Sequence, residues 1–140
     1  RDDILVSLAG PASNLAMATV ALVLLIVLKH AGGGVAIAAA VAMANHVPLN
    51  TTGIALFPIA MLLYYGVLIN LLLFVFNLIP VPPLDGSHML RHFLAYRVDQ
   101  VYDRIGMWGL LVVFLFGGSL IFGTFYSPLL NIFDHMLFRL

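Results

Sequence analysis

The 140-residue chain contains no cysteine and no glutamate, and only 9% of its residues are charged. Without cysteine, disulfides and thiolate metal ligands are excluded. A soluble domain usually carries about 25% charged residues, whereas 63% of this chain is hydrophobic, so we expect it not to be a soluble globular domain. The formal net charge is zero, which gives no reason to expect nucleic acid as a partner.

Long uncharged runs dominate what is present. Three of them, over about residues 4–28, 54–79 and 105–125, reach the roughly 20 apolar residues that a bilayer crossing requires. A chain in lipid must satisfy its own backbone hydrogen bonds, so each run predicts a helix. A shorter alanine-rich segment over 35–44 predicts an interfacial or re-entrant helix. The sequence therefore predicts an all-α integral membrane fold, a single transmembrane domain over 1–140 with about three transmembrane helices.

The end of the chain and the basic residues predict how the protein meets its membrane. Residues 127–140 predict an amphipathic helix lying in the membrane surface. Basic residues gather between the second and third spans, so the Arg91–Arg104 connection is expected to be cytoplasmic. We therefore expect a multi-pass membrane protein with lipid as a partner, and the sequence carries no signal for an oligomeric state. The polar face of the tail helix comprises Asn131, Asp134, His135 and Arg139.

A proline-rich run closes the second span, reading Asn-Leu-Ile-Pro-Val-Pro-Pro-Leu-Asp-Gly from Asn77 to Gly86. The helix should stop near Ile79, continue extended and restart near Asp85. An acidic group at membrane depth needs a cation, a metal or a proton, whereas an ordinary turn at the membrane edge would leave Asp85 solvated. Three residues of this run cannot continue an α-helix: Pro80, Pro82 and Pro83.

The run resembles the N-x-x-P-x-x-P-L-D-G signature of site-2 proteases, the intramembrane zinc metalloproteases. The first span contains Leu-Ala-Gly-Pro-Ala-Ser-Asn over residues 8–14, which is similar to the A-G-P-x-x-N element of that family. Both elements occur in the family's order, each inside a hydrophobic span. The resemblance covers about residues 1–97.

The resemblance implies specific roles. In the family, zinc is held by two histidines of an H-E-x-x-H helix and by the aspartate of the L-D-G element, which here is Asp85. Asn77 would steady the substrate or the oxyanion. The expected function is part of a zinc metalloendopeptidase that cuts the transmembrane segments of single-span membrane proteins. The remaining motif residues are expected to have structural roles: Gly10, Pro11, Asn14, Pro80, Pro82, Pro83 and Gly86.

The chain also departs from the family. Because it holds no glutamate, it lacks H-E-x-x-H and with it two zinc ligands and the general base. We therefore expect the back portion of such a protease, beginning partway through a longer product and inactive alone. Two alternatives remain open. Asp85, His88 and His92 could form a metal site by themselves, or the protein could be a non-catalytic membrane scaffold or an ion- or proton-handling, transporter-like protein.

Overall fold

The computed structural model describes residues 2–51, 54–82, 84–87, 106, 108–109 and 111–140. Within these ranges every regular element is helical and none is a strand, which confirms the all-α class. Three helical stretches in this part of the chain are long and apolar enough to cross a membrane: Leu8–Ala44, Phe57–Asn77 and Leu115–Arg139. Their number agrees with the three spans that the sequence predicts.

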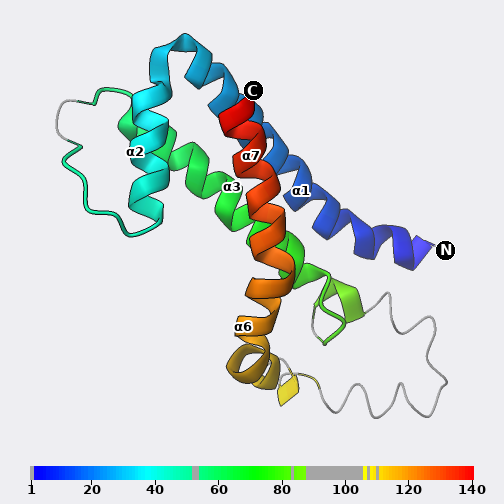
Figure 1. The fold of residues 1–140 in the computed structure, drawn as a ribbon. Coiled ribbons are helices and arrows are strands. Elements are labelled where there is room, and N and C mark those ends of the chain that lie inside the picture. Colours follow the sequence, from blue (N-terminus) through cyan, green and yellow to red (C-terminus); the bar gives the residue numbers. More distant parts are fainter. Residues whose placement is uncertain (1, 52–53, 83, 88–105, 107, 110) are drawn as a thin grey trace, which may run out of the picture.

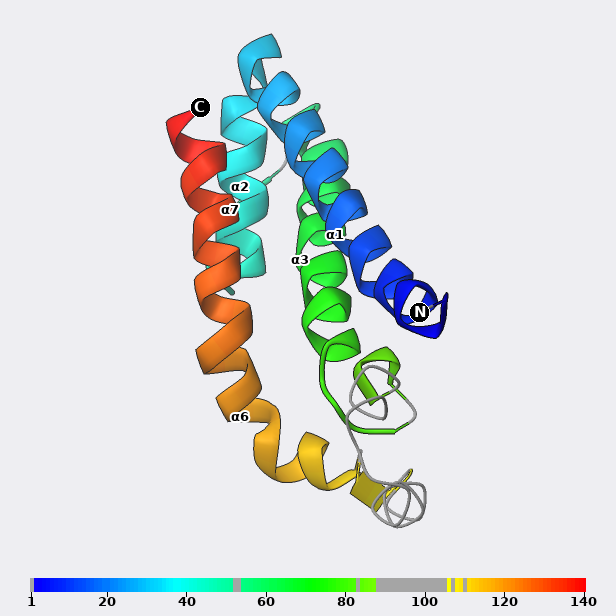
Figure 2. The same ribbon diagram turned by 90° about the vertical axis from the view of Figure 1, so that its right-hand side faces the viewer.

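The first stretch contains a sharp reversal. Helix α1 (Asp2–Leu28) continues into the short segment η1 (Lys29–Gly33), and α2 (Gly34–Ala44) then runs back along the bundle (Figures 1 and 2). Gly32 allows the reversal because its φ of 92° lies in a region that side-chain-bearing residues rarely adopt. Helix α2 is rich in alanine, and small side chains let helices approach closely in a membrane protein. Four of its residues are buried: Ala36, Ile37, Ala39 and Ala40.

Helix α3 (Phe57–Asn77) crosses α1 and packs against both α1 and α2 (Figure 2). Its buried residues recur every three or four positions, the spacing that places side chains on one helical face. This stripe meets an equally narrow stripe on α1 that includes Ala18, Ala21 and Leu25. The core therefore lies between α1, α2 and α3. The α3 stripe consists of Ala60, Tyr64, Val67, Leu71 and Val75.

The proline-rich stretch breaks the chain after α3. The helix ends at Asn77, and helical geometry returns at Asp85–Ser87, so the break and the restart agree with the sequence prediction. The connection between them is not extended, however. Tight turns fold it: the Val81 N–H donates to the Ile79 carbonyl at 2.8 Å, and the Leu84 N–H donates to the Val81 carbonyl at 2.9 Å. Since proline has no N–H to donate, the few remaining N–H groups bond to carbonyls two or three residues earlier.

The third stretch differs most from the prediction. Segments η2 (Val113–Gly117), α6 (Gly118–Ile121), η3 (Phe122–Tyr126) and α7 (Ser127–Arg139) follow one another without a break. The sequence instead divides this part of the chain into a span over 105–125 and a separate surface helix over 127–140. Helix α7 is amphipathic, but its apolar residues Phe133 and Leu137 are buried in the same core as α1 and α3. The predicted Arg91–Arg104 connection lies outside the described residues.

Candidate functional site

The two motifs of the sequence meet in space at Gly10 and Asp85. Gly10 lies on α1, and Asp85 begins the helical turn that follows the proline-rich stretch. A Cβ atom added to Gly10 would overlap the Asp85 Oδ2 atom and would lie 3.3 Å from its Cγ atom. The Asp85 carboxyl group therefore occupies the space that the missing side chain of Gly10 leaves on the surface of α1.

The neighbours of Gly10 anchor this part of α1. Pro11 is fully buried, and Asn14, one helical turn further along, is 8% exposed. Ser13 points outward, and its hydroxyl donates to the Gly10 carbonyl at 2.7 Å. The A-G-P-x-x-N element thus turns its proline and asparagine toward the protein and its glycine toward Asp85.

On its other side, the Asp85 turn packs against the end of α3. A Cβ atom added to Gly86 would lie 2.6 Å from the carbonyl oxygens of both Leu78 and Ile79. Only glycine therefore fits at this position without a backbone shift. Ser87 is 1% exposed, and its hydroxyl has no hydrogen-bond partner among the residues that the structure describes. The close contacts at Gly10 on α1 and at Gly86 against the end of α3 therefore fix the position of Asp85.

The remaining residues of the predicted motif differ in how deeply they are buried. Asn77 is the last residue of α3 and is partly buried, and within the described ranges no hydrogen bond joins it to Asp85. Pro82 is buried, whereas Pro80 is exposed. Pro83 lies outside the described residues. The structure therefore brings Gly10, Asp85 and Gly86 together and leaves Asn77 at the adjoining helix end.

The described residues do not by themselves fit a zinc ion. A catalytic zinc site needs three protein ligands and an open position. In the part of the chain that the structure covers, no group of three or more histidine, cysteine, aspartate or glutamate residues could hold a metal. Asp85 supplies one oxygen donor group next to α1. The alternative set of Asp85, His88 and His92 includes two residues outside the described ranges.

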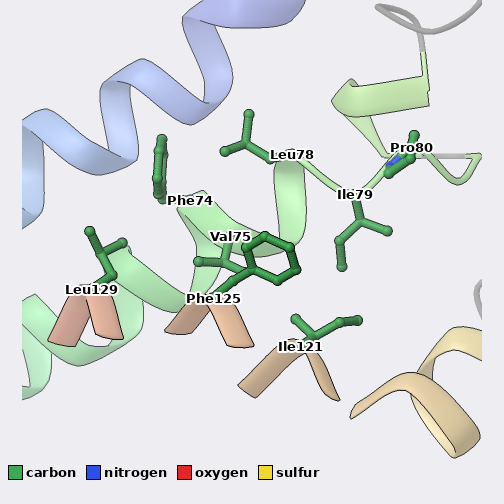
Figure 3. A pocket seen from close by; sticks show the side chains of 8 residues that line it. All are labelled: Phe74, Val75, Leu78, Ile79, Pro80, Ile121, Phe125 and Leu129. Carbon is green, nitrogen blue, oxygen red and sulfur yellow. The ribbon is translucent and has the colours of Figure 1, made fainter. Parts of the chain in front are cut away.

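An apolar pocket of about 500 Å³ lies beside this site. Its lining comes from the end of α3 with the three residues that follow it, and from the facing third stretch (Figure 3). The residues on the third stretch recur every fourth position, so they form one ridge. The lining residues are Phe74, Val75, Leu78, Ile79 and Pro80 on the α3 side, and Ile121, Phe125 and Leu129 on the ridge.

Sequence reasoning missed a polar contact between helices. The Tyr64 hydroxyl on α3 donates to the Asp134 carboxyl oxygens on α7 at 3.1 and 3.3 Å. The Tyr126 hydroxyl donates to the Leu68 carbonyl at 3.3 Å. In the sequence, Asp134 belongs to the outward polar face of a surface helix. A tyrosine within an apolar span and a carboxylate in the tail helix were the available signal, but only the packing of α7 pairs them.

A second contact that the sequence did not predict caps the C-terminal end of α7. The Lys29 ammonium group donates to the carbonyls of Leu137 and Phe138 at 3.0 and 3.1 Å. The last carbonyls of a helix lack helical partners, and a cation there also meets the negative end of the helix dipole. Lys29 therefore ties the end of α7 to the end of α1.

Comparison with known proteins identifies relatives. The protein-family model described as Peptidase family M50 matches residues 1–120. A Bacillus subtilis (strain 168) protein named "Putative zinc metalloprotease YwhC" is 35% identical over 109 residues, which is 78% of this chain. These residues are 42% of that protein, so the chain spans less than half the length of this relative. No solved structure matches the chain.

Proposed function

This chain belongs to peptidase family M50, the site-2 protease family, and we propose that it forms the Asp85-bearing part of an intramembrane zinc metalloendopeptidase. Membership of a membrane protease family and three helices suited to crossing a bilayer support a membrane location for the protein. The observation that supports the proposed activity is the contact of Asp85 with α1 at Gly10, which joins the two motifs of the family at one point.

In this proposal Asp85 is the third zinc ligand. Zinc takes carboxylate oxygen among its usual donors, and a catalytic site adds two further protein ligands. The two histidines would come from an H-E-x-x-H segment that is not part of this sequence. A bound zinc ion would supply Lewis-acid activation of a water molecule and of the carbonyl to be attacked. Asn77, at the end of α3, would steady the substrate or the oxyanion.

The rest of the proposal concerns the membrane and the substrate. The protein would be multi-pass, with the Arg91–Arg104 connection on the cytoplasmic side. Its substrates would be single-span membrane proteins cut within their transmembrane segments. This chain alone would not cleave them, because it lacks the general base and two ligands. The Pro80–Pro83 stretch would keep α3 from continuing across the site.

The test uses the complete protein that contains this chain, reconstituted with a single-span reporter substrate. Asp85→Asn keeps the shape of the side chain but removes its charge. We expect this change to abolish cleavage and to lower the zinc content measured by mass spectrometry. Asp134→Asn is the matched control, since it makes the same change at a carboxylate between α3 and α7. Full cleavage by the Asp85→Asn protein would refute Asp85 as a zinc ligand. A complete wild-type protein that does not cleave would instead favour a scaffold or an ion-handling protein.

A further inference from the structure

The apolar pocket lies directly behind the turn that carries Asp85. Ile79 contributes its side chain to the pocket (Figure 3). Its carbonyl oxygen lies so close to Gly86, the residue after Asp85, that a Cβ atom added to Gly86 would be 2.6 Å away. The Leu78 side chain also lines the pocket, and its carbonyl oxygen lies equally close to Gly86. Two residues therefore separate the pocket from the candidate zinc ligand. Whatever fills the pocket lies next to the site of the proposed reaction.

We propose that this pocket holds a bulky apolar side chain of the substrate, at one fixed position beside the bond that is cut. This inference rests on the proposed function, because it assigns the pocket to the same site. A volume of about 500 Å³ falls within the range of about 300–1,000 Å³ that is typical of ligand pockets. The lining is composed of aliphatic and aromatic side chains and one proline, which suits leucine- or phenylalanine-like groups.

The position of the pocket wall favours a substrate segment over a lipid chain. Leu78, Ile79 and Pro80 lie beyond the end of α3, so this wall is not helical. Irregular backbone at membrane depth is tolerated where protein covers it or where it lines a watery cavity, and not where it faces lipid. The Leu78 and Ile79 N–H groups already donate to carbonyls at the end of α3, so this wall presents apolar side chains to its occupant. Because the same two residues also lie against Gly86, beside Asp85, the occupant we expect is the substrate segment that reaches Asp85.

The opposite wall makes the pocket selective. Ile121, Phe125 and Leu129 belong to three consecutive segments, α6, η3 and α7, and still form one ridge. The segment η3 is a π-helix, a wider winding that often occurs at functional sites. Phe125 remains 64% exposed, so it borders the pocket without being part of the core. Changing the size of these side chains should change which substrate residues fit.

The experiment uses the complete protein with reporter substrates that carry alanine or leucine at each of the three residues on either side of the cleaved bond. At one position we expect leucine to raise kcat/KM at least about tenfold over alanine, since hydrophobic pockets discriminate by about 10–200-fold per methylene. Ile121→Trp should lower that leucine-to-alanine ratio by about tenfold. Phe125→Ala should shift the preference toward larger residues such as phenylalanine. Phe116→Ala, a 76% exposed phenylalanine on the same stretch outside the pocket, is the control.

Three results would overturn the inference. The first is an unaltered leucine-to-alanine ratio in both pocket variants while the protein still cleaves. The second is a ratio that responds to the acyl length of the lipid but not to the substitutions, which would assign the pocket to lipid. The third is a complete wild-type protein that cleaves no substrate, which would refute the proposed function itself.

Discussion

Gly10→Ala is the substitution that most directly tests how Asp85 is held. The added Cβ atom would overlap the Asp85 Oδ2 atom, which is the movable end of a side chain and not backbone. The carboxyl group can therefore yield by leaving its preferred rotamer, at a cost of about 0.5–1.5 kcal/mol. Replacing glycine by alanine inside a helix stabilises the folded state by about 1 kcal/mol. The two effects nearly cancel, so the fold should survive while the carboxyl group moves.

The expected result is a loss of function without a loss of stability. Substitutions that disturb the support of a metal ligand typically lower metal affinity or activity by about 10–100-fold. In the complete protein, Gly10→Ala should therefore reduce zinc affinity and cleavage within that range. The free energy of unfolding should change by less than about 1 kcal/mol, because the two estimated effects oppose each other. Zinc titration, reporter cleavage and thermal unfolding in detergent measure the three quantities.

Two controls make the result specific. Gly66→Ala introduces the same change on α3, where the nearest atom, the Ala21 Cβ, would lie at an ordinary 3.6 Å, so it should leave zinc binding intact. In an Asp85→Ala background the overlap is gone, so Gly10→Ala should raise the free energy of unfolding by about 1 kcal/mol, since double mutants expose whether two residues act through each other. A Gly10→Ala protein with wild-type zinc affinity and cleavage would show that the contact does not position Asp85.

The other predictions concern stability. Gly86→Ala places a Cβ atom 2.6 Å from two backbone carbonyls, so backbone must move, and thermal unfolding should show a loss of about 1–3 kcal/mol. Gly32→Ala should lower the free energy of unfolding by about 1–2 kcal/mol, because Gly32 has a positive φ. Gly34→Ala is the control and should not lower this free energy, since Gly34 has a φ of −56° and open space around it. Equal losses in the two proteins would contradict the reasoning. Tyr64→Phe removes the donor to Asp134 and should cost about 0.6–1.7 kcal/mol in denaturant unfolding. The neighbouring Tyr65→Phe is the reference, and no difference between the two would show that the hydrogen bond contributes nothing.

The sequence predicted the features that depend on local chemistry. Proline cannot donate a backbone hydrogen bond, so the end of α3 at Asn77 and the return of helix at Asp85 could be inferred from the residue order. The family followed from two short motifs and is confirmed by the match over residues 1–120. The tight turns between Ile79 and Leu84 were not foreseen, because they depend on which carbonyl each remaining N–H reaches. The roles of Asn77 and Asp85 remain predictions.

What the sequence could not predict are contacts between distant helices. Helical spacing places Asp134 on a polar face, and a polar face normally indicates water. Its partner is Tyr64 on α3, and that pairing requires the position of α7 along α3. The same holds for Lys29, which would ordinarily be placed at the membrane boundary but binds the last carbonyls of α7. Periodicity gives the face of a helix but not the neighbour that covers it.

These contacts connect the far end of the bundle with the candidate site. Lys29 and Tyr64 hold α7 against α1 and α3, and α7 continues directly from the ridge that forms one wall of the pocket. Gly10 and Gly86 place Asp85 between α1 and the end of α3. The candidate zinc ligand therefore depends on α1 and the end of α3, and the pocket depends on the end of α3 and the ridge, so the end of α3 is common to both. A substitution that loosens α7 should widen the pocket and weaken substrate selection before it affects Asp85, because the Asp85 turn contacts α1 and the end of α3.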